Sequence, residues 1–146
     1  MQEAIAEAKK AMEESEVPVG AVVVYEGEVI ARSHNLCEQN NNPTHHAEIL
    51  AINRALKTLG AKNLKGCELY VTLEPCAMCI GACALCKIDK VYFGAYDTKS
   101  GACGGKCDVL REGCYDYKTE IYGGIDETEC KKILTDFFLR VREEKE

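Results

Sequence analysis

Residues 43–48 read Pro-Thr-His-His-Ala-Glu, and residues 75–79 read Pro-Cys-Ala-Met-Cys. Together the two stretches supply one imidazole, that of His46, and two thiols, those of Cys76 and Cys79. One imidazole and two thiolates fill three positions of a tetrahedral zinc ion and leave the fourth for water, which is typical of a catalytic zinc site. The sequence therefore predicts a Zn²⁺ cofactor held by these three side chains.

Both stretches also carry the signals of a helix start. Pro43 and Pro75 lie just upstream of segments with helical spacing, and proline is favoured at such positions. Cys76 and Cys79 are three residues apart, so their sulfurs lie on one side of a helical first turn. We therefore expect two helix N-termini directed at one metal, where the positive ends of the helices favour thiolates.

Glu48 follows His46 by two residues, in the first turn of the predicted helix. In that place it can face the open position of the metal, take a proton from water and return the proton to a leaving group. The alternative is an ordinary solvated glutamate on the helix surface. The short separation from a metal ligand favours the catalytic role.

A structural zinc site is the alternative for the cluster as a whole, and it would need a fourth protein ligand. Cys83 and Cys86 continue the pattern of the first two cysteines. On a helix, however, Cys83 lies roughly 6 Å further along the axis than Cys79, and a zinc–sulfur bond is only about 2.3 Å long. We therefore predict that Cys83 and Cys86 are small buried residues. A second metal site or a redox pair is the alternative.

Length and composition place limits on the fold and the compartment. A chain of 146 residues is enough for one domain, so we predict a single domain over residues 1–146. No apolar run is long enough to span a bilayer and the first residues do not resemble a signal peptide, so we expect a cytoplasmic protein. The ten cysteines are therefore not expected to form a disulfide scaffold, which needs an oxidising compartment.

The formal net charge of −6 argues mildly against unspecific nucleic-acid affinity. It leaves room for a local basic patch, because binding depends on where the cations lie. The default interpretation of the basic residues in the first half of the chain is a solvated surface; these are Arg32, Arg54, Lys57, Lys62 and Lys65.

Hydrophobic periodicity predicts helices that alternate with strands. The expected helices cover residues 1–15, 46–59, 77–86 and a last segment from 126, with a short helical piece near 108–110. The expected strands cover residues 21–25, 28–33, 67–73, 88–93 and 118–122, the first two joined as a hairpin through Glu26 and Gly27. This alternation predicts an α/β protein, a three-layer α/β/α sandwich around a five-stranded sheet.

Two helices carry further expectations. The segment 77–86 is apolar nearly all round, so one face must meet the sheet and another must meet a partner, which predicts a homodimer. The last helix is expected to place one apolar side inward, comprising Ile133, Leu134, Phe137, Phe138 and Val141.

The segments that flank the metal motifs add a resemblance. Residues 42–49, 70–79 and 93–101, with 16–21 near the start and 136–138 near the end, together resemble the bacterial tRNA-specific adenosine deaminases. The resemblance covers nearly the whole chain in order. The metal motifs are those of all cytidine-deaminase-like enzymes, and the flanking segments indicate this branch.

The resemblance implies a cytidine-deaminase-like fold with a mixed sheet and a homodimer that converts the wobble adenosine of a tRNA anticodon stem-loop to inosine. It implies zinc ligation by the three residues above and proton transfer by Glu48. It further implies that Asn35 contacts the base, that Val19 forms an apolar wall, and that the backbone N–H of Ala47 donates to the edge of the base. The target base must leave its stack to be reached.

Three features depart from the family pattern: His45 stands where a small residue is usual, Cys83 and Cys86 replace bulkier or polar residues, and the tail 140–146 is more acidic than the expected basic tail. Two other functions stay open. One is a deaminase of a free purine (guanine) or of a cytosine nucleoside or base, which shares the metal set. The other is a zinc-stabilised RNA-binding module without catalysis.

Overall fold

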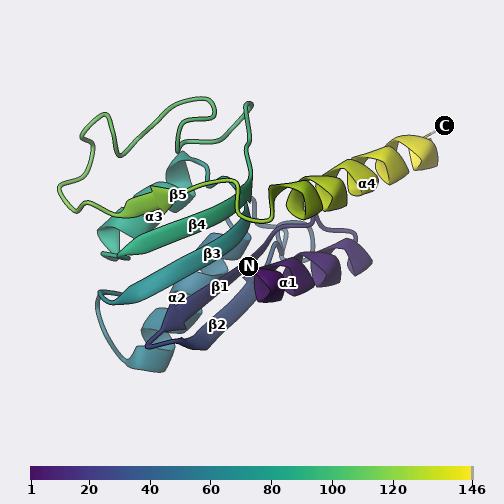
Figure 1. Cartoon of the computed structure of the whole chain (residues 1–146). Coiled ribbons are helices and arrows are strands. Elements are labelled where there is room, and N and C mark those ends of the chain that lie inside the picture. The colour runs from purple at the N-terminus through teal and green to yellow at the C-terminus, as the bar shows by residue number, and fades with distance from the viewer. Residues whose placement is uncertain (146) are drawn as a thin grey trace.

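A five-stranded sheet forms the middle of the protein, and the computed structural model describes residues 1–145 (Figure 1). The strands follow the spatial order β2-β1-β3-β4-β5. The pairs β1–β2 and β1–β3 are antiparallel, whereas β3–β4 and β4–β5 are parallel, so the sheet is mixed. The strands are β1 (Gly20–Tyr25), β2 (Glu28–His34), β3 (Cys67–Leu73), β4 (Lys90–Ala95) and β5 (Glu120–Tyr122).

Helices cover both faces of the sheet, which confirms the predicted three-layer α/β/α architecture. The helices α1 (Gln2–Glu13) and α4 (Glu127–Lys145) contact each other and one face of the sheet. The helices α2 (Ala47–Leu59) and α3 (Ala77–Leu85) lie together on the opposite face (Figure 1). Among residues 1–145, no helix combines the length and the apolarity needed to cross a bilayer.

The main core lies between the sheet and the α2–α3 layer. Alternate strand residues such as Val23, Leu69 and Val71 are fully buried there, as the period of two in a strand requires. The α2 face toward the sheet consists largely of alanines, among them Ala51 and Ala55, and their small side chains let the helix approach the strands closely.

Two predicted turns have the expected backbone geometry. Glu26 and Gly27 both have positive φ, 50° and 80°, which is the type I′ geometry that suits the twist of a two-residue hairpin. Gly60 ends α2 in the left-handed region at φ 60°, where glycine carries no Cβ penalty.

The structure corrects three expectations. Residues 108–110 form turns, with a single bridge between Cys103 and Asp108, instead of a short helix. Phe138 is 46% exposed rather than on the inner side of α4. On α3, Ile80 is fully buried in the main core, so the apolar residues left at the surface are Met78 and Leu85.

Candidate active site

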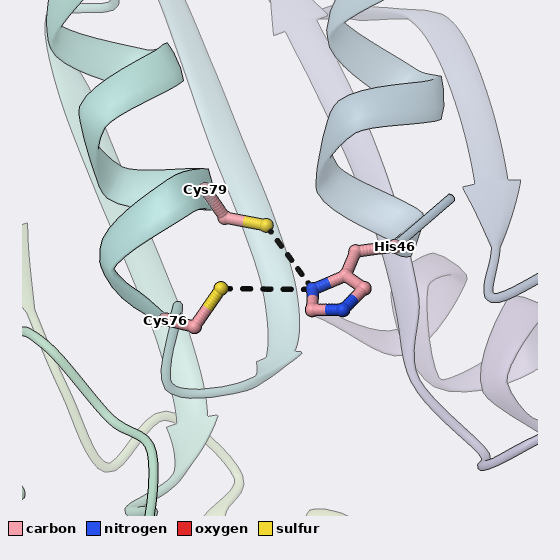
Figure 2. A group of neighbouring side chains, drawn as sticks. All are labelled: His46, Cys76 and Cys79. Atoms are coloured by element: carbon pink, nitrogen blue, oxygen red, sulfur yellow. Dashed lines mark hydrogen bonds between the residues drawn. The ribbon is translucent and has the colours of Figure 1, made fainter. Parts of the chain in front are cut away.

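The three predicted metal ligands come from two helix starts. His46 immediately precedes α2 and Cys76 immediately precedes α3, both with extended backbone angles, while Cys79 lies in the first turn of α3. The Nδ1 atom of His46 is 3.6 Å from the Cys76 sulfur and 3.4 Å from the Cys79 sulfur. Figure 2 shows the imidazole ring facing both sulfurs across the gap between the two helices. The positive ends of both helix dipoles therefore act on the same point.

These distances fit a zinc ion. Bonds of about 2.0–2.1 Å to imidazole nitrogen and about 2.3 Å to thiolate sulfur, in a tetrahedral arrangement, separate nitrogen from sulfur by about 3.5 Å. All three ligand atoms lie within 4.8 Å of one another, and no other such group of His, Cys, Asp or Glu occurs in residues 1–145. A four-ligand structural site is therefore not formed by the described residues.

The cysteines further along α3 lie apart from this cluster. Cys83 is fully buried in the main core, as predicted, and Cys86 is partly buried against it. Burial raises the pKa of both thiols, so both stay protonated and unreactive near neutral pH.

The protonation of the cluster favours metal binding. A hydrogen bond from the Cys79 thiol and a second from His46 lower the pKa of Cys76 to about 4. The hydrogen bond to Cys76 also raises the pKa of His46, whereas the neighbouring Cys76 thiolate and burial raise the pKa of Cys79. Cys76 is therefore the thiol of the pair that loses its proton more readily, and metal binding releases the protons that the ligands still hold.

Glu48 lies in the first turn of α2 with only 4% of its surface exposed. Its side chain lines a cavity of about 270 Å³ together with His46 and Cys76. Burial, the largest influence, raises the pKa of the Glu48 carboxyl above its usual value. A raised pKa makes the carboxyl a stronger base, which suits a group that takes a proton from water.

Two of the three residues expected to hold a base, Val19 and Asn35, line the same cavity. Val19, at 4% exposure, forms part of its apolar wall, and Asn35 lines it directly after the end of β2. Ala47 is fully buried, and its backbone N–H donates a 2.8 Å hydrogen bond to Oδ1 of Asn35. The structure thus uses this N–H to tie the two predicted base-contacting positions to each other.

Two buried glutamates in the cavity wall were not identified from the sequence. Glu16 accepts hydrogen bonds from the backbone N–H groups of Glu38 and Gln39, at 3.0 and 2.8 Å, and so holds the segment after β2. Its side chain is 1% exposed. A carboxylate that accepts several backbone N–H groups in this way fixes a loop that has no regular structure.

Glu74, the second buried glutamate, holds the segment after β4 through hydrogen bonds from the backbone N–H groups of that segment. Its carboxylate accepts hydrogen bonds from the N–H groups of Asp97, Cys103 and Gly105, at 2.8 to 2.9 Å. A Cβ at Gly105 would lie 2.4 Å from the Glu74 carboxylate, so the approach requires glycine. Two features of the sequence could have indicated this contact: an acidic residue beside Pro75, and a glycine-rich segment about thirty residues later whose backbone can approach a carboxylate closely.

The two other histidines, His34 and His45, contact polar side chains outside the metal cluster. His45 lies between the side-chain amides of Asn40 and Asn42, at 2.9 and 3.0 Å from its ring nitrogens. His34 lies between Glu7 and Glu14 of the N-terminal segment, at 3.4 and 2.7 Å. Neither ring belongs to the metal cluster.

Comparison with known proteins gives a consistent result. Residues 1–142 match the family described as MafB19-like deaminase. The chain is 49% identical over 145 residues to the tRNA-specific adenosine deaminase of Bacillus subtilis (strain 168), an alignment that covers 99% of this chain and 90% of that protein.

Solved structures agree with the sequence relatives. A structure from a study of A-to-I editing by tRNA:A34 deaminases at the wobble position of transfer RNA superimposes with a TM-score of 0.87 at 43% identity, covering 92% of this chain and 97% of that one. A guanine deaminase from Bacillus subtilis superimposes less closely, with a TM-score of 0.63 at 35% identity over 79% of this chain and 68% of that one. The chain therefore belongs to the MafB19-like deaminase family, within the branch of the tRNA-specific adenosine deaminases.

Proposed function

We propose that this protein is a zinc-dependent hydrolase that converts the wobble adenosine of a tRNA anticodon to inosine. The observation that carries the proposal is the cluster of His46, Cys76 and Cys79 at two helix N-termini, with the buried carboxylate of Glu48 on the same cavity. Similarity to tRNA-specific adenosine deaminases over nearly the whole chain supports the choice of substrate.

In this mechanism His46, Cys76 and Cys79 hold the metal and Glu48 moves the protons. When bound, zinc supplies a Lewis acid that brings the pKa of water close to neutral. Glu48 takes one proton from the attacking water as the new C6–O bond forms and delivers it to N1 of the adenine ring. It then carries the second proton from the C6 hydroxyl to the amino nitrogen as the C6–N bond breaks and the C6=O bond forms. Water and adenosine thus become ammonia and inosine. The raised pKa of Glu48 suits a group that accepts and returns a proton in one cycle.

The cavity beside the metal cluster admits a base but not a folded loop. Its volume of about 270 Å³ is at the lower limit for small-molecule sites. The target adenosine must therefore be turned out of its stack, as in other base-modifying enzymes. Val19 packs against the base, and Asn35, whose backbone N–H donates a 3.1 Å hydrogen bond to the Val19 carbonyl, positions the edge of the base.

A second hollow next to this cavity supports an RNA substrate over a free nucleoside. Its volume is about 610 Å³, and it shares Val17, Leu73, Asp97 and Ser100 with the first cavity. Tyr96 and Phe138, which are 53% and 46% exposed, both line it, together with Lys99 and Lys131. Exposed aromatic rings stack on unpaired bases, and the lysines suit neighbouring phosphates. Nucleotides flanking the target would occupy this hollow.

The alternative substrate is a free purine such as guanine, or a cytosine nucleoside or base. The guanine deaminase that resembles this chain favours it, because it shows that the fold also accommodates a free base. The open aromatic hollow beside the cavity is what makes us prefer RNA, since a free base would leave it unused.

We further propose that residues 1–146 act as one deaminase domain, that this domain is cytoplasmic, where tRNA is decoded, and that it works as a homodimer. The support for a dimer is the outer side of α3, where Met78 is 38% exposed and Leu85 is 69% exposed. Apolar residues of this size at the surface of a short helix are suited to burial against a second copy.

A substrate panel tests the function. The zinc-loaded protein is offered tRNA anticodon stem-loops with adenosine at the wobble position, alongside free adenosine, cytidine and guanine, and product formation is followed by chromatography. Stem-loops should be deaminated far faster than any free compound. If a free compound is deaminated at least as fast as every stem-loop, the RNA substrate is rejected and the free base or nucleoside becomes the preferred substrate. Absence of any turnover by zinc-loaded protein that still binds the stem-loops would favour the non-catalytic RNA-binding module.

A further inference from the structure

A basic hollow lies along the open edge of the sheet, away from the active-site cavity. Its volume is about 510 Å³, and it is formed by β2 together with residues of α1 and α2. Because β2 is the first strand in the spatial order, this edge of the sheet is not covered by another strand. We call it the β2-edge groove; its charged lining comprises the cations Lys10, Arg32, Arg54 and Lys57 and one carboxylate, Glu7.

Several of these side chains are held in place. Arg54 donates a 2.5 Å hydrogen bond from Nη1 to the backbone carbonyl of Arg32. Lys10 is 2.7 Å from the buried carboxylate of Glu7, yet 59% of the Lys10 side chain stays exposed. Arg32 contacts Glu3 at the rim and is 49% exposed. Lys10 and Arg32 are thus paired with carboxylates, and the excess positive charge of the groove comes from Arg54 and Lys57, on a chain whose formal net charge is −6.

Protection of the edge strand is the ordinary explanation for such charges, because a cation on an edge strand discourages pairing with other chains. It accounts for Arg32, which lies on β2. It does not account for Lys10, Arg54 and Lys57, which project from two different helices toward the same hollow. Cations that converge from separate elements on a concave surface are suited to an extended anion.

The groove is aligned with the active site. Asn35, on the cavity, follows Arg32 by three residues of extended chain, or about 10 Å. On the other side, α2 begins beside the metal cluster, and Arg54 and Lys57 are about 10 and 15 Å along its axis from Ala47. One strand of a nucleic-acid duplex carries a phosphate about every 3.4 Å of its axis. The groove cations therefore lie about three to four phosphates along the backbone from the position of the reacting base.

We propose that the β2-edge groove binds the phosphate backbone of the helical stem that adjoins the deaminated loop. This inference rests on the proposed function and extends it, because it assigns the part of the RNA outside the loop to a defined surface. The arginines supply planar donors fixed by the protein, and the lysines supply exposed point charges.

The test compares two doubly substituted proteins. Arg54→Gln/Lys57→Gln removes two groove cations, and Lys62→Gln/Lys65→Gln removes two exposed cations outside the groove, so both lose the same charge. Binding of the zinc-loaded proteins to an inosine-containing stem-loop is measured over a range of salt concentrations. A loop oligonucleotide without the stem is the second ligand.

The groove variant should bind the stem-loop about 5–50-fold more weakly at low salt, and the slope of log affinity against log salt should fall by about 1–2 because fewer counterions are released. Its affinity for the loop oligonucleotide and its maximal rate on adenosine stem-loops should match the wild type. The Lys62/Lys65 control should keep the wild-type slope. Lys57→Glu, a single surface change, should weaken binding in the same direction.

The outcomes separate the two proposals. If the wild-type protein deaminates stem-loops while the groove variant keeps the wild-type salt slope, the groove does not bind RNA and its cations only protect the edge. An equal loss in the Lys62/Lys65 control would likewise reject a specific surface. If the wild-type protein deaminates no stem-loop at all, the proposed function itself fails.

Discussion

The backbone N–H of Ala47 donates a 2.8 Å hydrogen bond to Oδ1 of Asn35. This bond satisfies one of the N–H groups that the start of α2 leaves without a partner inside the helix. Because the Asn35 oxygen is engaged in this way, the side chain presents its NH₂ group, a donor, to the cavity that it lines. It also fixes Asn35 relative to His46, the neighbour of Ala47 and a predicted metal ligand.

Substitutions at Asn35 should separate these two tasks. Asn35→Asp keeps the acceptor for Ala47 but loses the donor to the base, so it should fold with near wild-type stability and lower kcat/KM at least tenfold. Asn35→Ala also leaves the buried N–H of Ala47 without a partner, which costs about 1–3 kcal/mol. Thermal unfolding and kinetics on a stem-loop measure both effects. Wild-type kinetics in Asn35→Asp would show that this residue does not contact the base.

Removal of a metal ligand should remove the metal. We expect about one zinc per chain, and Cys76→Ala or Cys79→Ala should lose most of it because a Cys2His set cannot spare a thiolate. The matched control is Cys83→Ala, in the same helix and fully buried, which should keep its zinc. Elemental analysis of the three purified proteins decides the matter. Full zinc occupancy in both ligand variants would disprove this assignment of the ligands.

Glu48→Gln, in contrast, should retain zinc and stability while losing deamination. A positioned acid or base contributes about 10²–10⁴-fold to the rate, and Glu48 serves two successive proton transfers here. Glu38→Gln is a suitable control, since Glu38 is exposed at the rim of the same cavity and should leave the rate within about threefold. Loss of zinc in Glu48→Gln would identify Glu48 as a ligand and contradict the mechanism.

The proposed dimer can be tested on the exposed side of α3. Met78→Glu and Leu85→Glu each place a charge where an apolar contact is expected, and should shift the protein toward the monomer in sedimentation experiments. Leu139→Glu provides the control, because Leu139 is also apolar and 46% exposed but lies on α4. A wild-type protein that sediments as a monomer at micromolar concentration would reject the dimer.

The carboxylate of Glu7 should make stability depend on pH. Burial alone raises its pKa, but hydrogen bonds and charges from Lys10 and His34 outweigh burial and hold the pKa below its usual value of 4.5. A carboxyl group whose pKa is lower in the folded than in the unfolded state stabilises the fold at pH values above its unfolded-state pKa. This stabilisation is lost as the pH falls through the folded-state pKa, because the carboxylate is then protonated. Glu7→Gln should therefore lower the free energy of unfolding by about 1 kcal/mol at pH 7. The difference from the wild type should become smaller below pH 4.5. Chemical denaturation from pH 7 to 3 measures it; a constant cost across that range would contradict the assignment.

Most of the fold could be predicted because its signals are local. The apolar run of β1, the alternation of buried residues along most of β3, the Glu26-Gly27 turn and the Gly60 helix end each depend on a few neighbouring residues. The metal cluster was predictable for the same reason, since the spacing of Cys76 and Cys79 and the helix-start signals are also local. That these cysteines meet His46 followed from the chemistry of the combined set, since one imidazole and two thiols complete an open zinc site.

Features that depend on distant partners were missed or misplaced. Helical periodicity placed Phe138 on the inner side of α4, but the far part of that helix projects past the sheet and has no strand to pack against (Figure 1). Glu16 and Glu74 bind backbone groups more than twenty residues away. Nothing in the local pattern distinguishes such a carboxylate from one in solvent.

The three hydrogen bonds that Glu74 accepts after β4 also bear on how this protein can change over evolutionary time. They fasten the chain up to Gly105 to the wall of the active site. The stretch from Lys106 to Lys118 that follows is mostly exposed and contains no helix or strand. Val109 and Leu110 pack against the main core and the Tyr117 hydroxyl donates to Asp89, whereas residues 111–114 are all exposed. Lengthening a surface loop costs little, so an insertion within 111–114 should leave the catalytic geometry unchanged.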